Sequence, residues 1–214
     1  MNTSLDIEVF TGGYFMTNGY VVKHAGNGRV VVIDAPEGIS AFVTEKGLEV
    51  AALLLTHQHY DHVIDVAPLK AQFDCPVYAR AQPDDDLTLK SVLADTFGWG
   101  WNVCDYQVDH LLEGKDESQI EVEGLQFELL HIPGHSPDSI CFHHSESGNV
   151  FGGDVLFQEG IGRTDFPHGD GPELLSGIRR KLYPLAEETE VFPGHGPSTT
   201  IGHEKIHNPF CPAL

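Results

Sequence analysis

Residues 53–62 read LLLTHQHYDH, and the last six of them carry four side chains of metal-binding type. These side chains are His57, His59, Asp61 and His62. They follow directly on a buried strand predicted over 51–56. Imidazole and carboxylate groups suit zinc, iron and manganese. Without a cation these groups would crowd and repel one another, and one ion seldom takes so many ligands from so short a stretch. The spacing therefore predicts a metal site and favours two ions.

Three further groups of the same kind occur later, each directly after a predicted strand and beside glycine. They are His135 in HIPGHSPDS, Asp154 in VFGGDVLF and His195 in VFPGHGP. Taken alone, each would be interpreted as a cap or a solvated residue. Strand ends at one edge of a sandwich can bring such residues together, however, and glycine lets the backbone turn sharply there. Four strand ends that each offer metal-binding groups therefore indicate one shared site.

The motifs THQHYDH, PGHS, GGD and PGHG, taken together, resemble the metallo-β-lactamase superfamily over essentially the whole chain. The resemblance implies an α+β fold, a four-layer αββα sandwich, in a single domain that spans 1–214. It also implies two metal ions. The first would be bound by His57, His59 and His135, the second by Asp61, His62 and His195, and Asp154 would bridge them.

Two longer segments, GIGRTDFP at 160–167 and PGHGPSTTIGHEKIHNPF at 193–210, are similar to the single-domain, glyoxalase II-like bacterial hydrolases. This resemblance implies cleavage of a thioester of the S-2-hydroxyacylglutathione type. A hydroxide shared by the two metals would attack the carbonyl carbon, with Asp61 and Asp154 as catalytic groups. Glyoxalase II carries a further C-terminal helical region that helps to hold glutathione. That region does not follow His195 here, so the recognition of glutathione stays open.

The expected cofactors are two divalent ions, with zinc first and iron or manganese acceptable to the same ligands. Three other functions remain open. A persulfide dioxygenase would use one iron on His57, His135 and Asp154, and a lactone or ester hydrolase would use the same two-metal site. A metal-binding module without catalysis is the third, although such a protein would be expected to have lost some of these ligands. True β-lactamases with the best-known site resemble the chain less, because they place cysteine where Asp154 stands.

A second set of residues is expected to support the site rather than bind metal. Asp34 in VVIDAP resembles a non-ligand aspartate of the superfamily, and with Thr56 it is expected to fix imidazole tautomers. Arg163 and Asp165 are expected to form a charge pair that positions a loop near Asp154, or else a plain surface salt bridge. Phe166 is expected to line the substrate pocket.

The aromatic segment 97–106 and His168 allow only weaker predictions. Trp99, Trp101 and Tyr106 would form either a wall over the substrate or, more simply, part of the core or a dimer contact. His168 is a second candidate for the pocket lining. The oligomeric state is not predicted.

The sequence has 32 acidic residues against 12 basic ones, a formal net charge of −20. This balance opposes binding to nucleic acid, which depends on basic residues that replace counterions. No signal peptide and no apolar run of about 20 residues is evident, so a cytoplasmic protein without a membrane segment is expected. Its partner would be a small-molecule thioester. The cysteines are expected to be free thiols: Cys75, Cys104, Cys141 and Cys211.

Hydrophobic residues form 41% of the 214-residue chain, enough for one compact fold. Strands are predicted at 7–10, 19–23, 30–34, 51–56, 77–79, 125–131, 139–143, 150–153 and 190–192. Helices are predicted at 38–46, 63–71, 84–95, 172–183 and 199–206. Strands occur in clusters with single helices between them, which favours two packed sheets flanked by helices over a regular βαβ alternation.

Overall fold

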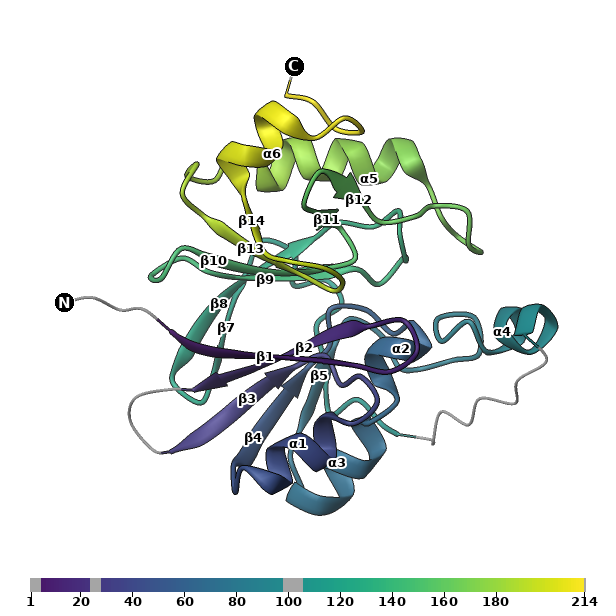
Figure 1. Ribbon diagram of the computed structural model, residues 1–214, viewed down its shortest axis with the longest axis vertical. Helices are drawn as coiled ribbons and strands as arrows, with labels where there is room; N and C mark the ends of the chain where they lie inside the picture. Colours follow the sequence, from purple (N-terminus) through teal and green to yellow (C-terminus); the bar gives the residue numbers. More distant parts are fainter. Residues whose placement is uncertain (1–4, 24–27, 98–105, 214) are drawn as a thin grey trace.

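The computed structural model describes residues 5–23, 28–97 and 106–213. Two six-stranded sheets lie face to face, and helices cover the outer face of each sheet (Figure 1). The predicted four-layer αββα sandwich is therefore confirmed. The outer layers are α1 and α3 on one side and α5 and α6 on the other.

The first sheet has the order β1-β2-β3-β4-β5-β6. Its strands are β1 (Asp6–Gly12), β2 (Thr17–Lys23), β3 (Arg29–Ile33), β4 (Glu49–Leu54), β5 (Val77–Ala79) and β6 (His110–Leu111). The first three are antiparallel, and β3 to β6 are parallel. Parallel strands need crossover connections, and these contain α1 (Ile39–Glu45), α2 (Tyr60–Val63), α3 (Val66–Phe73) and α4 (Lys90–Phe97). The carboxyl ends of β3 and β4 therefore meet at one edge of the sheet.

The second sheet has the order β14-β13-β10-β9-β8-β7. Its strands are β7 (Gln119–Val122), β8 (Leu125–His131), β9 (Ile140–His144), β10 (Asn149–Gly153), β13 (Glu190–Pro193) and β14 (Thr199–Thr200). The hairpin of β11 (Leu156–Phe157) and β12 (Gly160–Ile161) follows β10. The outer layer consists of α5 (Gly171–Gly177), a π-helical turn η1 (Ile178–Leu182) and α6 (Ile201–His207).

Apolar side chains fill the space between the two sheets. Phe127, Phe142 and Phe151 from the second sheet pack against Ile33 and Leu54 from the first, and all five are fully buried. Separate apolar clusters join α1 and α3 to the first sheet and α5, η1 and α6 to the second. Burial of large apolar side chains is the main stabilising term in such a core. The well-packed core therefore fixes the positions of the strand ends from which the loops at the edge of the sandwich begin.

Some predicted element boundaries are wrong. The helix predicted at 63–71 is α3, which begins only at Val66 and ends at Phe73, and the one predicted at 84–95 begins only at Lys90. The Asp84 carboxylate accepts hydrogen bonds from the backbone N–H groups of Asp86 and Leu87, which stabilises a turn there instead. The helix predicted at 199–206 starts as β14, and 172–183 changes to π-helical hydrogen bonding at Ile178.

Three of the four cysteines lie in the described part of the chain. Cys75, Cys141 and Cys211 are free thiols, as predicted, and all three are buried, whereas Cys104 lies outside the described residues. Among the described helices, none is long and apolar enough to cross a bilayer.

Candidate metal centre

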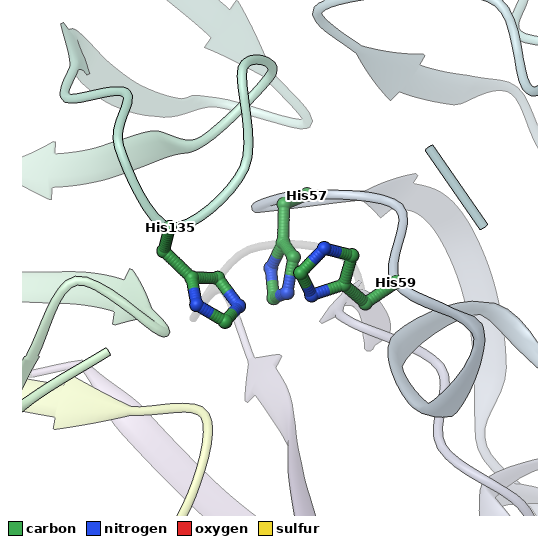
Figure 2. Close-up of side chains that lie close together, drawn as sticks. All are labelled: His57, His59 and His135. Carbon is green, nitrogen blue, oxygen red and sulfur yellow. The ribbon is translucent and has the colours of Figure 1, made fainter. Parts of the chain in front are cut away.

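Three imidazole rings face one another from two different loops (Figure 2). His57 and His59 lie in the turn between β4 and α2, and His135 lies in the loop after β8. The metal-binding atoms of these three residues all lie within 4.8 Å of one another. The turn between His57 and His59 is tight because α2 starts immediately afterwards, with the His62 N–H donating to the His59 carbonyl at 2.9 Å.

The structure brings all seven proposed ligands to one place. A second group with ligand atoms within 4.8 Å of one another consists of Asp61, His62 and His195, and a third of His57, His62 and Asp154. The first and second groups share no residue. They are the two sets of three that the resemblance to the superfamily assigns to separate ions.

Asp154, at the carboxyl end of β10, lies between the two groups. Its Oδ2 is 3.4 Å from Nε2 of His135 in the first group and 3.4 Å from Nε2 of His195 in the second. Its Oδ1 is 3.4 Å from Nε2 of His62. One carboxylate is thus in reach of both groups, which is the placement that a bridging ligand needs.

Several of these atoms are buried and lack a hydrogen-bond partner: Nε2 of His57, His62 and His135, and Oδ1 of Asp154. Buried polar atoms are nearly always paired, so such atoms call for a reason. Divalent cations would satisfy all four, and imidazole nitrogen with carboxylate oxygen is a donor set that zinc, iron and manganese accept. The residues therefore fit a pair of metal ions.

The other ring nitrogen of most of these histidines has its own partner. Nδ1 of His62 is 2.9 Å from Asp34 Oδ2, Nδ1 of His135 is 2.7 Å from the Arg163 carbonyl, and Nδ1 of His195 is 3.1 Å from the Phe15 carbonyl. These partners only accept, so each Nδ1 donates and each Nε2 keeps its lone pair for a metal.

Asp34 holds two parts of the ligand loop at once. Besides His62, its carboxylate accepts hydrogen bonds from Thr56 N at 2.8 Å and Thr56 Oγ1 at 2.7 Å. Thr56 Oγ1 in turn lies 3.2 Å from Nδ1 of His57. Asp34 is 1% exposed and has a φ of 58°, a left-handed conformation that Asp and Asn tolerate better than most residues. The supporting role expected of Asp34 and Thr56 agrees with these contacts.

A residue that sequence reasoning missed supports Asp61. The Thr17 hydroxyl, on β2, donates to Asp61 Oδ2 at 2.7 Å, and that oxygen also lies 3.4 Å from His195 Nε2. The neighbouring Asn18 donates through Nδ2 to the carbonyls of Pro193 and Gly196. No spacing signal links Thr17 to a ligand 44 residues away. Only the sheet order brings β2 to this position.

Glycine is required where the backbone approaches the ligands. A Cβ added at Gly194 would lie 2.1 Å from Asp154 Oδ1 and 2.6 Å from His62 Cε1. A Cβ at Gly153, which has a φ of 51°, would lie 2.3 Å from Thr56 Oγ1. The glycines beside Asp154 and His195 therefore make room for the ligand cluster itself.

Burial and neighbouring charges set the protonation of the cluster. Burial, together with the surrounding imidazoles, lowers the pKa of His57 and His59 well below the usual value. Burial alone would raise the pKa of Asp154, but His62 and His195 outweigh it and lower that pKa well below its usual range. Burial would lower the pKa of His62 and His195, but the neighbouring carboxylates of Asp61 and Asp154 outweigh it and raise both. Metals bind neutral imidazole and ionised carboxylate, so a bound cation would displace the protons of these two histidines.

Comparison with known proteins agrees with this geometry. The model of the metallo-β-lactamase superfamily matches residues 12–195. The chain belongs to the metallo-β-lactamase superfamily. Hydroxyacylglutathione hydrolase GloC of Haemophilus influenzae is 40% identical over 168 residues, 78% of this chain and 79% of that protein.

Two solved structures of superfamily members show the same fold. The B3 metallo-β-lactamase BLEG-1 is 34% identical, with a TM-score of 0.86 over 96% of this chain and 99% of that chain. TTHA1623, solved in a di-iron-bound form, is 38% identical, with a TM-score of 0.79 over 95% of this chain and 99% of that one. This protein is therefore a metallo-hydrolase of the superfamily with a His and Asp metal site.

A cavity of about 240 Å³ opens onto the metal-binding groups. The cluster forms its floor through His59, Asp61, His135, Asp154 and His195. The remaining lining residues are Phe15, Tyr60, Leu89, Val92, Leu93, Arg163 and Phe166. The walls of this cavity are thus largely apolar. Arg163 is the one basic side chain of Lys or Arg type among its lining residues.

The weaker sequence predictions for the pocket differ in outcome. Phe166 lines the cavity, whereas His168 is not among its lining residues; the His168 side chain is 59% exposed and lies 3.8 Å from Asp86. Arg163 and Asp165 form a charge pair with two hydrogen bonds of 2.6 Å, which lower the pKa of Asp165 to about 2. Both side chains are more than half exposed, and the Arg163 guanidinium lies 4.0 Å from the Phe166 ring centroid.

The aromatic segment is only partly described. Tyr106 is buried in the cluster beneath α3, which agrees with the core interpretation. Trp99 and Trp101 lie outside the described residues. Most of the apolar wall was not predicted: Phe15 lies just before β2, and Leu89 ends a turn at a φ of 56°. No motif or spacing distinguishes either residue from other apolar residues of the sequence.

Proposed function

We propose that this protein hydrolyses thioesters of the S-2-hydroxyacylglutathione type at a site that holds two divalent metal ions. The observation that carries the proposal is the pair of complete three-residue groups with Asp154 between them, at the floor of one cavity. The relative GloC, named a hydroxyacylglutathione hydrolase, supports the choice of substrate. His57, His59 and His135 would hold the first ion, Asp61, His62 and His195 the second, and Asp154 would contact both.

When bound, two such ions supply a water of lowered pKa and polarise the carbonyl oxygen of the substrate. Zinc is the first choice, and iron is a close second because TTHA1623 was solved with two irons. Manganese accepts the same ligands.

The residues of the chain have separate tasks in this proposal. Asp61 and Asp154 offset the positive charge and accept a hydrogen bond from the attacking water, which orients it toward the carbonyl carbon. Thr17 holds Asp61 in place through a hydrogen bond of 2.7 Å. The leaving thiolate of a cysteine-type thiol has a conjugate acid of pKa about 8.5 and needs no separate proton donor.

The cavity supports a small substrate rather than a polymer. Its volume of about 240 Å³ suits an acyl group with part of its thiol, and its walls contain Phe15, Leu89, Leu93 and Phe166. Apolar walls exclude water and strengthen the electrostatic effect of the cluster on the substrate. The net charge of −20 disfavours nucleic acid as a substrate.

One experiment separates this function from its alternatives. Hydrolysis of S-D-lactoylglutathione by the metal-loaded protein is followed together with oxygen uptake on addition of glutathione persulfide. The proposal expects loss of the thioester and no oxygen uptake. Oxygen uptake without thioester loss would overturn it in favour of a one-iron persulfide dioxygenase on His57, His135 and Asp154.

Two further substrates complete the test. A lactone and a β-lactam are added separately, the latter because BLEG-1 is named a β-lactamase. Cleavage of either one, at a rate well above that of the thioester, would replace the proposed substrate and keep the two-metal site. The variant Asp61→Asn tests whether cleavage takes place at the proposed site, because it keeps the shape of the side chain and removes its charge. It should lower turnover of whichever substrate is cleaved at the proposed site.

A further inference from the structure

A buried chain of polar side chains runs beside the metal centre without belonging to it. It consists of Tyr106, Gln58, Asp138 and Ser136. The Tyr106 hydroxyl donates to Gln58 Oε1 at 2.9 Å, Gln58 Nε2 donates to Asp138 Oδ2 at 3.1 Å, and the Ser136 hydroxyl donates to Asp138 Oδ1 at 2.5 Å. Gln58 is 0% exposed and Asp138 is 3% exposed. None of these atoms takes part in the proposed chemistry.

The orientation of the Gln58 amide is determined by its partners. Its Nε2 also donates to the Ala81 carbonyl at 3.1 Å. A carbonyl and a carboxylate only accept hydrogen bonds, so both must face the NH₂ group, and Oε1 is left for the Tyr106 hydroxyl. Each heavy atom of the Gln58 amide that can form a hydrogen bond therefore has a partner, and the side chain has one well-defined position.

Burying the Asp138 carboxylate at this position costs free energy. Burial raises the pKa of its carboxyl group, because the ionised form loses water. Two hydrogen-bond donors, one on each oxygen, offset that loss in part. An apolar residue in its place would remove the acceptor of the Ser136 hydroxyl and one acceptor of Gln58 Nε2. The presence of Asp138 points to a task that an apolar residue would not perform.

The position of these four hydrogen-bonded side chains indicates that task. Gln58 lies between His57 and His59 in sequence, and Ser136 and Asp138 follow His135 directly. The Gln58–Asp138 hydrogen bond joins residues 80 positions apart. It is therefore a direct side-chain link between the two loops that carry the first group of histidines. Among the described contacts, the second group (Asp61, His62 and His195) has no hydrogen bond to any of these four polar side chains.

We infer that the Gln58–Asp138 hydrogen bond is a positioning device for the first metal: it sets the spacing between the His57–His59 turn and the His135 loop. This inference rests on the two-metal site of the proposed function. Asp138 acts through the histidines and does not touch the ion or the substrate. Removing the link should therefore weaken one ion of the pair and leave the other in place.

The test measures metal binding rather than turnover. Metal-free full-length protein, unaltered and as Asp138→Ala, is titrated with zinc against a chromophoric chelator. In Asp138→Ala we expect one of the two ions to bind about tenfold more weakly, or worse, the size of effect that outer partners of ligands have. The other ion should keep its affinity within about twofold. The same loss should appear when Asp138→Ala is combined with His195→Ala, because that background leaves only the first group intact.

Two further variants separate positioning from general damage. Asp138→Asn should restore the affinity to within about threefold, because its oxygen can face Gln58 while the Ser136 hydroxyl turns to accept from its NH₂. Glu204→Ala is the matched control: Glu204 is 0% exposed and accepts from Thr199 and Asn208, on β14 and after α6. It should lower the thermal stability of the metal-free protein and leave both zinc affinities unchanged.

Contrary results are easy to recognise. Equal weakening of both ions, or a loss no greater than in Glu204→Ala, would overturn the inference, since Asp138 would then be an ordinary structural acid. So would a failure of Asp138→Asn to restore binding. If the unaltered protein binds two ions and cleaves no thioester, the proposed function fails while this test remains valid.

Discussion

The two halves of the sandwich supply metal ligands in different ways. The half built on β1 to β6 offers His57, His59, Asp61 and His62 from one turn after β4. The half built on β7 to β14 offers His135, Asp154 and His195 from three separate loops. In the first half, neighbouring residues determine where each ligand lies. In the second, the relative positions exist only once the sheet has formed, so they depend on packing far from the site.

The largest effect is expected from the residue that joins the two halves. Asp154→Ala removes the carboxylate that reaches both groups, so neither ion keeps its full ligand set. Thioester turnover should fall by about a thousandfold or more, equivalent to about 4 kcal/mol of transition-state stabilisation. Metal analysis of the purified variant should show fewer than two ions. His59→Ala provides the comparison, since it should weaken only the first ion.

A variant that keeps two ions and a tenth of the activity would contradict this expectation. The two halves would then each hold an ion independently, and Asp154 would be a neighbour rather than a shared ligand.

The next effect concerns packing in the second half. Gly194→Ala would place a Cβ 2.1 Å from Asp154 Oδ1, so the carboxylate must move, and a shift of about 1 Å at a catalytic group costs about a hundredfold in rate. Gly196→Ala is the matched control, with open space around its Cβ but a φ of 74°. It should cost about 1 kcal/mol of stability and leave the rate nearly unchanged. Kinetics and thermal unfolding measure the two effects separately, and equal rates in both variants would refute the packing explanation.

A smaller effect is expected in the first half, where local hydrogen bonds hold the turn. Asp34→Asn keeps the left-handed backbone but places an NH₂ group against donors on Thr56 or His62. The affinity for the second ion, on His62, should fall about tenfold. A chelator competition with zinc measures this. The prediction is wrong if the affinity is unchanged while stability falls, because Asp34 would then serve only the fold.

The smallest effect lies at the opposite edge of the first half, at the amino end of β5. Burial would raise the pKa of Asp109, but hydrogen bonds from Lys70 and from Val77 N outweigh it and lower that pKa. A lowered pKa in the folded state means that the stabilisation is present above about pH 4 and is lost as the pH falls through the folded-state value.

Asp109→Asn should therefore destabilise the metal-free protein by less than about 1 kcal/mol at pH 7, as expected for a partly exposed ion pair. The difference from the unaltered protein should shrink below about pH 4, and urea unfolding at several pH values measures it. Zinc affinity should not change. A difference that stays constant with pH would show that the charge of Asp109 is not the cause.

Much of the fold and the positions of the candidate ligands could be predicted, because both depend on patterns that a sequence shows directly. The four-layer sandwich follows from clustered strands and from motifs at their ends. The HxHxDH spacing alone indicates a metal site, and the positions of His135, Asp154 and His195 at strand ends connect them to it. Only the division of the ligands between two ions needed the resemblance. The spacing does not select the metal, because zinc, iron and manganese accept the same His and Asp ligands.

The walls of the cavity could not be predicted in the same way. Phe15 and Leu93 look like any other apolar residues, and their position over the site depends on how a hairpin and α4 pack against α2. Thr17 and Asn18 were missed for a similar reason, since a hydroxyl or an amide on a strand carries no pattern. The start of the helix predicted over 84–95 was wrong because the Asp84 side chain stabilises a turn there, and α4 begins only at Lys90.

The hydrogen bond from Asn18 to the Pro193 carbonyl spans 175 residues and has a consequence for biosynthesis. At about 5–20 residues per second, the ribosome needs about 10–35 s after Asn18 before Pro193 exists. For most of that interval the His57–His62 turn has been made while His195 has not. The group of Asp61, His62 and His195 can therefore form only after strands of both sheets have been synthesised.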